Sequence, residues 1–183
     1  GNLEYPPKSI SSYTERATGQ SEPRVYRDDE DRNQVLSEHR DVRSLAGDPT
    51  RGKIVFEKQC GNCHRLGETG HPVGSDLAGL RDRSVDALLV AILDPNRAVE
   101  AKYLQYEVLT RDGRIVTGMI SSESSNNIVL TAADGKQHAI LRTEIEALQT
   151  NARSLMPAGL EKELSKQQLA DVISYVAGAS KNP

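Results

Sequence analysis

Tryptophan is absent from the 183 residues of this chain, and apolar residues make up only 37% of them. Both features predict a small protein core. No stretch approaches the ~20 apolar residues that a membrane-spanning helix requires. The net charge is −3 and no cluster of basic residues offsets it, which argues against a nucleic-acid partner. Charges of both signs with a slight acidic excess instead fit a carrier that docks weakly on other proteins.

Cysteine is also scarce, and the two cysteines of the chain form a motif. Residues 60 to 64 read Cys-Gly-Asn-Cys-His, so Cys60 and Cys63 are followed directly by His64. This C-x-x-C-H pattern is the attachment signature of c-type haem. Two thiols at this spacing can each add to a vinyl group of one porphyrin, and His64 then supplies the proximal imidazole to the iron. The sequence therefore predicts one covalently bound haem c.

Other uses of a cysteine pair fit the sequence less well. A thioredoxin-like redox pair belongs in a βαβ context, and half a zinc site needs a second pair of ligands; neither is visible. A structural or redox disulfide between Cys60 and Cys63 is the remaining alternative.

Haem attachment implies a compartment. Haem c is attached outside the cytoplasm, so we expect a periplasmic or otherwise extracytoplasmic protein. The chain opens Gly1-Asn2-Leu3-Glu4, without the basic start and apolar run of a signal peptide. We therefore expect a processed form, or a part of a larger or anchored protein.

Two segments stand apart from the helical remainder. Residues 1–47 are polar and predict an N-terminal arm or linker, with a partner-docking tail as the alternative suggested by Tyr5, Tyr13 and Tyr26. Residues 97–150 alternate in polarity, with turns at Asp112-Gly113 and Asp134-Gly135. This pattern predicts a small antiparallel β module of about four strands, inserted into the domain that spans residues 48–183.

Three helices are predicted in all, two before the β module and one after it. Asp48 is a suitable N-cap for a helix that begins at Pro49 and runs to about Gln59. A second helix runs from Ser84 to Leu93, and a capping box of Ser165 and Gln168 begins the last. We expect the first and last helices to cross through three residues, Gly52, Phe56 and Tyr175.

A haem that carries electrons needs a sixth ligand, and methionine is the usual one. Met156 lies in an irregular loop before the last helix, where a flexible thioether can reach across, whereas Met119 lies in a strand pattern. Met156 is the predicted ligand; an open site or a histidine is the alternative. The remaining histidines are interpreted as solvated polar residues: His39, His71 and His138.

These motifs resemble those of class I cytochrome c and, more narrowly, of the planctomycete-type haem-binding domain. The likeness covers about residues 46 to 178. It implies a mainly α cytochrome c fold, three core helices around the haem, with the β module inserted at about 97–150 and α+β overall. The stretches that bear it are Asp48–Gly52, Phe56, Cys60–His64, Gly74–Gly79, Ile92–Pro95, Tyr103, Asp112–Gly118, Ser154–Leu160 and Leu169–Tyr175.

The resemblance also implies two further haem contacts. Such domains have a proline whose carbonyl accepts the Nδ1–H of the proximal histidine, and Ser75 stands at that position here. A carbonyl needs no proline ring, so Ser75 is expected to accept this bond. Arg83 aligns with an arginine expected to bind a haem propionate, with Arg81 as its rival and a solvated surface charge as the alternative for both.

The sequence as a whole favours a monohaem c-type cytochrome that transfers single electrons and is not itself an enzyme. Its expected partner is a redox protein, a dehydrogenase or an oxidase, to which the chain could be joined in a larger oxidoreductase. A haem-based sensor or interaction module and a peroxidase-like haem enzyme are the alternatives; the second requires that Met156 does not bind the iron.

Overall fold

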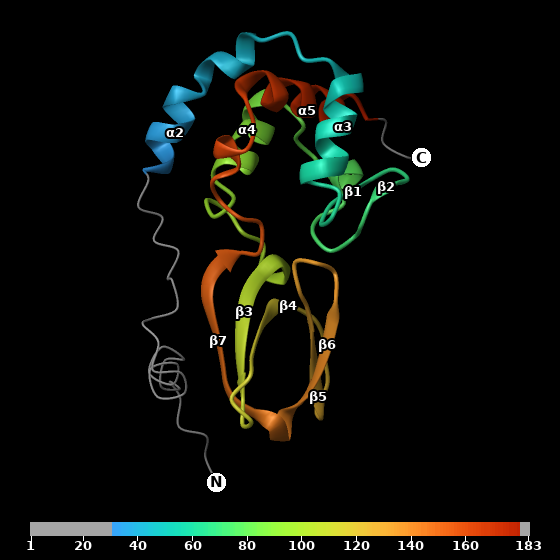
Figure 1. Ribbon diagram of the computed structural model, residues 1–183, viewed down its shortest axis with the longest axis vertical. Helices are drawn as coiled ribbons and strands as arrows, with labels where there is room; N and C mark the ends of the chain where they lie inside the picture. Colours follow the sequence, from blue (N-terminus) through green and yellow to red (C-terminus); the bar gives the residue numbers. More distant parts are fainter. Residues whose placement is uncertain (1–30, 180–183) are drawn as a thin grey trace. The chain divides into compact units, whose positions relative to one another are not determined.

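The computed structural model describes residues 31–179, with Asn151 described by its backbone alone. The chain divides into two compact units. The helical unit contains the described residues up to Val99, the short stretch Ala133–Gly135 and the residues from Met156 onward. The β unit contains Glu100–Ala132 and Lys136–Leu155. The α-helices and strands of both units are labelled in Figure 1.

The helices of the helical unit begin at the residues that the sequence indicates. Asp48 accepts hydrogen bonds from Thr50 N and Arg51 N, and Ser84 accepts from Ala87 N. Ser165 and Gln168 form the capping box at the start of the last helix. These three predicted starts are confirmed. The α-helices are α2 (Arg32–Glu38), α3 (Pro49–Gln59), α4 (Val85–Leu93) and α5 (Lys166–Gly178). The short elements are η1 (Arg40–Ser44), β1 (Arg65–Leu66), β2 (Thr69–Gly70), η2 (Leu77–Gly79) and η5 (Leu160–Lys162).

Helices α3 and α5 cross at close range. A Cβ atom on Gly52 would overlap the carbonyl group of Asp171 and lie 2.8 Å from Tyr175 Cβ. The rings of Phe56 and Tyr175 pack with their centroids 5.5 Å apart at an interplanar angle of 57°. The predicted crossing through Gly52, Phe56 and Tyr175 is therefore confirmed.

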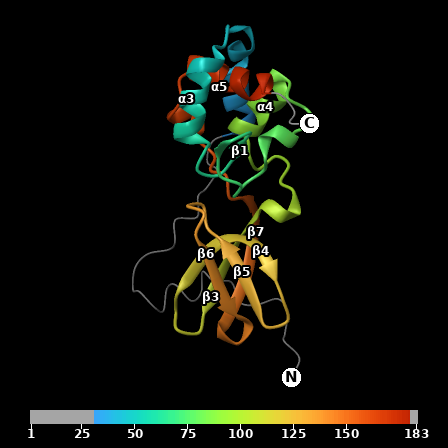
Figure 2. The ribbon, with the colours of Figure 1, turned by 90° about the vertical axis from the view of Figure 1, so that its right-hand side faces the viewer.

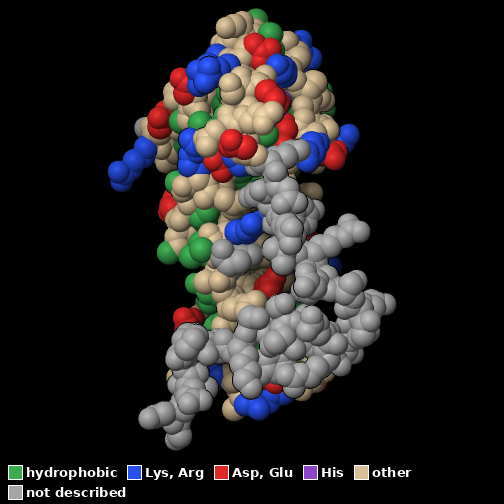
Figure 3. All heavy atoms as spheres, turned by 90° about the vertical axis from the view of Figure 1, so that its left-hand side faces the viewer, with side chains coloured by type: hydrophobic (Ala, Val, Ile, Leu, Met, Phe, Trp, Pro, Cys, Tyr) green, Lys and Arg blue, Asp and Glu red, His purple; other side chains and the backbone are tan. Residues whose placement is uncertain are grey.

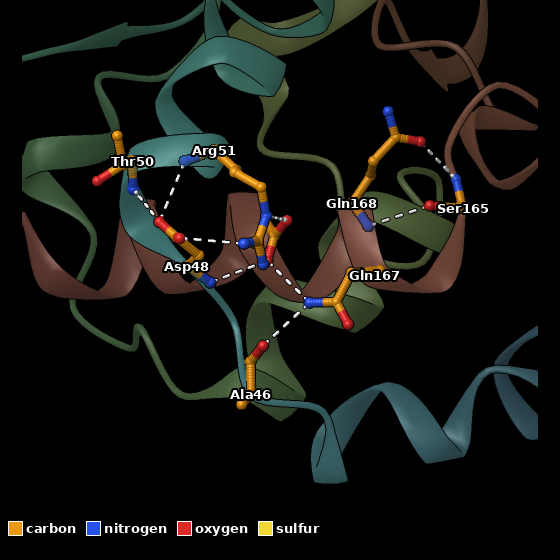
Figure 4. Close-up of polar contacts among 8 residues, drawn as sticks. Ala46, Asp48, Thr50, Arg51, Ser165, Gln167 and Gln168 are labelled. Atoms are coloured by element: carbon orange, nitrogen blue, oxygen red, sulfur yellow. Dashed lines mark hydrogen bonds and ion pairs between the residues drawn. The ribbon is translucent and has the colours of Figure 1, made fainter.

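A buried carboxylate ties the start of α3 to α5. Asp171 accepts hydrogen bonds from Asp48 N at 2.8 Å, from Arg51 Nε at 2.8 Å and from Gln167 Nε2 at 2.9 Å. Gln167 also donates to the carbonyl of Ala46, so the segment before α3 is held as well (Figure 4). The pKa of Asp171 is lowered to about 2. The largest cause is the Arg51 guanidinium, and the hydrogen bonds from Asp48 N and Gln167 contribute less.

The core of the helical unit includes residues from the segment that we assigned to the arm. Val35 in α2 and Val42 in η1 are buried together with Phe56 and the apolar faces of α4 and α5. Arg32 donates to Glu161 Oε1 at 3.0 Å and to the carbonyl of Leu93 at 3.2 Å. The three tyrosines of the arm lie outside the described residues. No helix within residues 31–179 is long and apolar enough to cross a membrane.

The β unit is one antiparallel sheet of five strands in the order β6-β5-β4-β3-β7. Irregular register between β3 and β7, and between β4 and β5, accompanies the strong curvature that Figure 2 shows. Val108, Ile128, Leu130 and Ile140 form its buried core. The elements are η3 (Ala101–Tyr103), β3 (Leu104–Thr110), β4 (Ile115–Glu123), β5 (Asn127–Thr131), β6 (Gln137–Leu141), η4 (Arg142–Glu144) and β7 (Ile145–Ser154).

The expectation of a mainly α cytochrome c fold, with three core helices and a small insertion, is wrong. Within residues 31–179 the β-strands hold as many residues as the four α-helices do, so the fold class is α+β. The sequence predicted about four strands ending near residue 150, whereas the sheet has a fifth strand, β7, that continues to Ser154. Six of its ten residues are in register with residues of β3, which lies far away in the sequence, and local periodicity does not reveal such a partner.

Candidate functional site

The two cysteines lie on a turn that continues α3. Cys60 is the C-cap of this helix, and its N–H donates to the carbonyl of Phe56 at 2.8 Å. Both Cys63 N, at 3.0 Å, and His64 N, at 2.8 Å, donate to the carbonyl of Cys60. The C-x-x-C-H segment is thus folded into one compact turn. Both cysteines are free thiols and partly buried.

The imidazole of His64 is held by the backbone of a neighbouring loop. Its Nδ1 lies 2.8 Å from the carbonyl oxygen of Ser75, and the contact expected from the resemblance is therefore present. A carbonyl oxygen can only accept, so this distance favours the tautomer in which Nδ1 bears the proton. Nε2 of His64 is then the nitrogen with a free lone pair, which is the state that a metal ligand requires.

Several parallel contacts fix this loop against the C-x-x-C-H turn. Gly74 N donates to the carbonyl of Cys63 at 2.6 Å. The residues after His64 and Ser75, Arg65 and Asp76, form an ion pair with 2.6 Å between Arg65 Nη2 and Asp76 Oδ2. That ion pair lowers the pKa of Asp76, and the hydrogen bond from Ala78 N lowers it further. The loop is therefore tied down on both sides of the Ser75 carbonyl.

Glycine is required beside the imidazole. A Cβ atom on Gly74 would lie 2.8 Å from His64 Cε1 and 3.1 Å from Nδ1. A Cβ on Gly70, which has a positive φ of 88°, would overlap the carbonyl oxygen of His64. The chain thus leaves room for the His64 ring where any larger residue would displace it.

The thiols are electrostatically unlike those of a redox pair. Burial, with a smaller contribution from Cys63, raises the pKa of Cys60 to about 11. Burial also raises the pKa of Cys63. Reactive cysteines of thiol–disulfide enzymes have a lowered pKa instead. Within residues 31–179 no three His, Cys, Asp or Glu side chains gather as a metal site would require, so a zinc site has no further ligands there.

The predicted axial methionine and its rival fall into different units. Met156 lies in the irregular stretch after β7 and belongs to the helical unit, as His64 does; its side chain is partly buried. Met119 is in β4 of the β unit and is only 6% exposed, as a core side chain would be. The structure thus places Met156, but not Met119, in the unit that contains the C-x-x-C-H turn.

The remaining candidate side chains differ in exposure and in hydrogen bonding. Arg83 donates to the carbonyls of Ala78 and Ala179, and its buried Nε has no hydrogen-bond partner. Its rival Arg81 is exposed. Nδ1 of His39 lies 2.8 Å from the carbonyl of Val35 at the end of α2. His71 and His138 are exposed.

Sequence reasoning missed the ion pair beside the site and the buried carboxylate of α5. Arg65 and Asp76 flank His64 and Ser75 with the same separation of 11 residues, and that matched spacing was the signal available. Asp171 had no comparable signal, because an aspartate in a helix is ordinarily a surface residue.

Comparison with known proteins gives no relative from which a role could be transferred. No protein-family model matches the chain, and no curated protein matches it.

Proposed function

We propose that this chain is a monohaem c-type cytochrome and transfers single electrons in an extracytoplasmic compartment. Cys60 and Cys63 would attach the haem through thioethers, and His64 would be the proximal ligand of the iron. The observation that supports this most strongly is the 2.8 Å contact between His64 Nδ1 and the Ser75 carbonyl, directly beside two free thiols. The planctomycete-type haem-binding domain remains the family that the motifs resemble.

The donor set fits a covalent haem better than it fits the other uses of two cysteines. A thiol redox pair would need the thiolate at neutral pH, whereas burial raises the pKa of both Cys60 and Cys63. Gly74 leaves room for the His64 ring, Gly70 leaves room for the His64 carbonyl, and the Ser75 carbonyl selects the tautomer with a free Nε2. These features leave His64 Nε2 and the two cysteine sulfur atoms available to one haem.

Haem, when bound, supplies a one-electron redox couple. Met156 is the residue of the helical unit that we propose would bind the iron besides His64, because a thioether ligand favours electron transfer over catalysis. We propose Arg83 for a haem propionate, since its guanidinium is half-buried in the same unit and its Nε has no partner. The proposed roles of these residues are to attach the haem, to orient it and to bind its iron. None of them is assigned to acid–base chemistry.

The proposed partner is a redox protein, either a dehydrogenase or an oxidase. Figure 3 shows acidic and basic side chains interspersed over the coloured part of the face that it draws. Such a surface fits weak and short-lived docking, which suits a protein that must release its partner after each electron.

Covalent attachment is the property to test. The chain would be produced in cells that have the machinery for haem c maturation, and haem would be sought on the polypeptide after denaturation. We expect haem on the wild type, less stable haem after Cys60→Ser or Cys63→Ser, and none when both are changed. His64→Gln should abolish maturation, whereas His71→Gln, a change at an exposed histidine, serves as the matched control. Wild-type chain that emerges without haem, or with a Cys60–Cys63 disulfide, would contradict the proposal.

A further inference from the structure

Ser75 presents two oxygen atoms to the proximal imidazole, and only one of them belongs to the backbone. The carbonyl oxygen lies 2.8 Å from His64 Nδ1, and the hydroxyl oxygen of the same residue lies 3.4 Å from it. A proline at this position, as in the domains that the motifs resemble, would offer the carbonyl alone. The side-chain contact is therefore a property of this sequence.

The hydroxyl is an acceptor in this arrangement. The short carbonyl distance places the proton on Nδ1, so a second oxygen facing the same nitrogen shares that proton in a three-centre hydrogen bond. Ser75 cannot shift easily from this position. Gly74 N is bonded to the Cys63 carbonyl at 2.6 Å, and Asp76 both accepts from Ala78 N at 3.0 Å and pairs with Arg65.

We propose that Ser75 is a positioning residue whose hydroxyl increases electron donation from His64 to the iron and so lowers the reduction potential. This inference rests on the proposed function. When a histidine binds a metal through Nε2, a hydrogen bond accepted from its Nδ1–H raises the basicity of the ring. A more basic ligand favours the oxidised iron. The second acceptor adds to the effect of the carbonyl while leaving the ring in place.

The test compares side chains with and without the hydroxyl on the haem-loaded chain. Ser75→Ala and Ser75→Pro keep the carbonyl and remove the hydroxyl, and both should shift the midpoint potential upward. Ser75→Thr retains a hydroxyl and should stay near the wild-type value. Ser44→Ala, at an exposed serine of the same unit, is the control and should leave the potential unchanged.

A second readout does not depend on haem. In the apoprotein, the Nδ1 proton resonance of His64 should move upfield in Ser75→Ala and Ser75→Pro and stay in place in Ser75→Thr, because a shared proton is deshielded by both acceptors. A merely structural role for Ser75 would change stability and leave this resonance in place.

The outcomes separate the two proposals. Wild-type chain that attaches no haem would refute the proposed function, and this inference with it. Haem on the wild type together with an unchanged potential in Ser75→Ala and Ser75→Pro would overturn this inference alone. A shift in Ser75→Thr as large as that in the hydroxyl-free variants would overturn it too, because the hydroxyl would then have no part in the effect.

Discussion

Gly52 and Asp171 bring two helix backbones into direct contact. A Cβ atom at Gly52 would overlap the carbonyl group of Asp171, and only the missing side chain allows α3 to approach α5 this closely. Because α3 ends at the first cysteine of the attachment motif, this crossing also determines where the proposed haem would be held.

Substitution of Gly52 should therefore destabilise the helical unit. We expect Gly52→Ala, and more so Gly52→Leu, to lower the free energy of unfolding by about 1–3 kcal/mol, because the added atoms force the helices apart. Urea denaturation followed by circular dichroism measures the change. Gly178→Ala is the control, since a Cβ there meets nothing within 4 Å. Equal stability of Gly52→Ala and the wild type would show that the crossing relaxes without cost.

Asp171 should make the stability of the protein sensitive to acid. Its pKa is about 2 in the folded chain, below the ordinary value of 3.8, because Arg51 and two further donors stabilise the carboxylate. Its contribution is therefore present above about pH 4 and is lost as the pH falls towards 2. Asp171→Asn should cost about 1–3 kcal/mol at pH 7 and flatten this part of the pH profile.

Urea midpoints between pH 2 and pH 7 test this prediction. Glu163→Gln, which removes a charge from an exposed side chain, is the matched control and should change the profile little. If the urea midpoints of the wild type and of Asp171→Asn fall in parallel between pH 4 and pH 2, the Asp171 carboxylate is not the group that causes the loss of stability in acid.

The Cys60 thiol should react slowly in the apoprotein. Burial raises its pKa to about 11, so only a small fraction is thiolate at pH 8. In a Cys63→Ser variant, the rate of alkylation by iodoacetamide should keep rising above pH 9. A small-molecule thiol with a pKa of about 8.5 gives the reference curve. A plateau near pH 9 in the protein would mean that Cys60 is more exposed than the structure indicates.

Met156 should determine the spectrum of the haem-loaded protein. We expect Met156→Ala to remove the weak charge-transfer absorption of sulfur-ligated ferric haem and to change the reduction potential. Met119→Ala should leave both unchanged and instead lower the stability of the β unit by about 2–5 kcal/mol, because Met119 is only 6% exposed. The opposite pattern would exchange the roles of the two methionines.

The β unit should serve recognition rather than attachment. It has a core of its own and no cysteine, so replacing residues 104–132 and 136–154 by short linkers, with Ala133–Gly135 of the helical unit kept, should leave covalent haem on the helical unit. Reduction by ascorbate should keep its rate, while electron exchange with a protein donor should slow. An unchanged rate with the protein donor, or loss of Met156 ligation, would show that the unit has a different role.

Much of the candidate site could be predicted because its contacts are close in sequence. The helix starts at Asp48, Ser84 and Ser165 depend on side chains within three residues of the cap. The contact of His64 with Ser75 spans one short loop, but the family resemblance implied it and the local pattern did not. Val35 and Val42 were harder to place, because they belong to a broken apolar stripe in a polar stretch, and such a stripe does not show that the stretch packs into the core.

The sequence by itself determined the C-x-x-C-H spacing, the starts of α3, α4 and α5 and the residues of the α3–α5 crossing, since local hydrogen bonding and side-chain size decide them. Only the tertiary structure decided the fold class and the burial of the Asp171 side chain. The length of β7, ten residues, depends on its pairing with β3. The burial of Asp171 depends on Arg51, about 120 residues away in the sequence. Such partners are chosen by packing and by the need to satisfy buried polar groups, which no local pattern records.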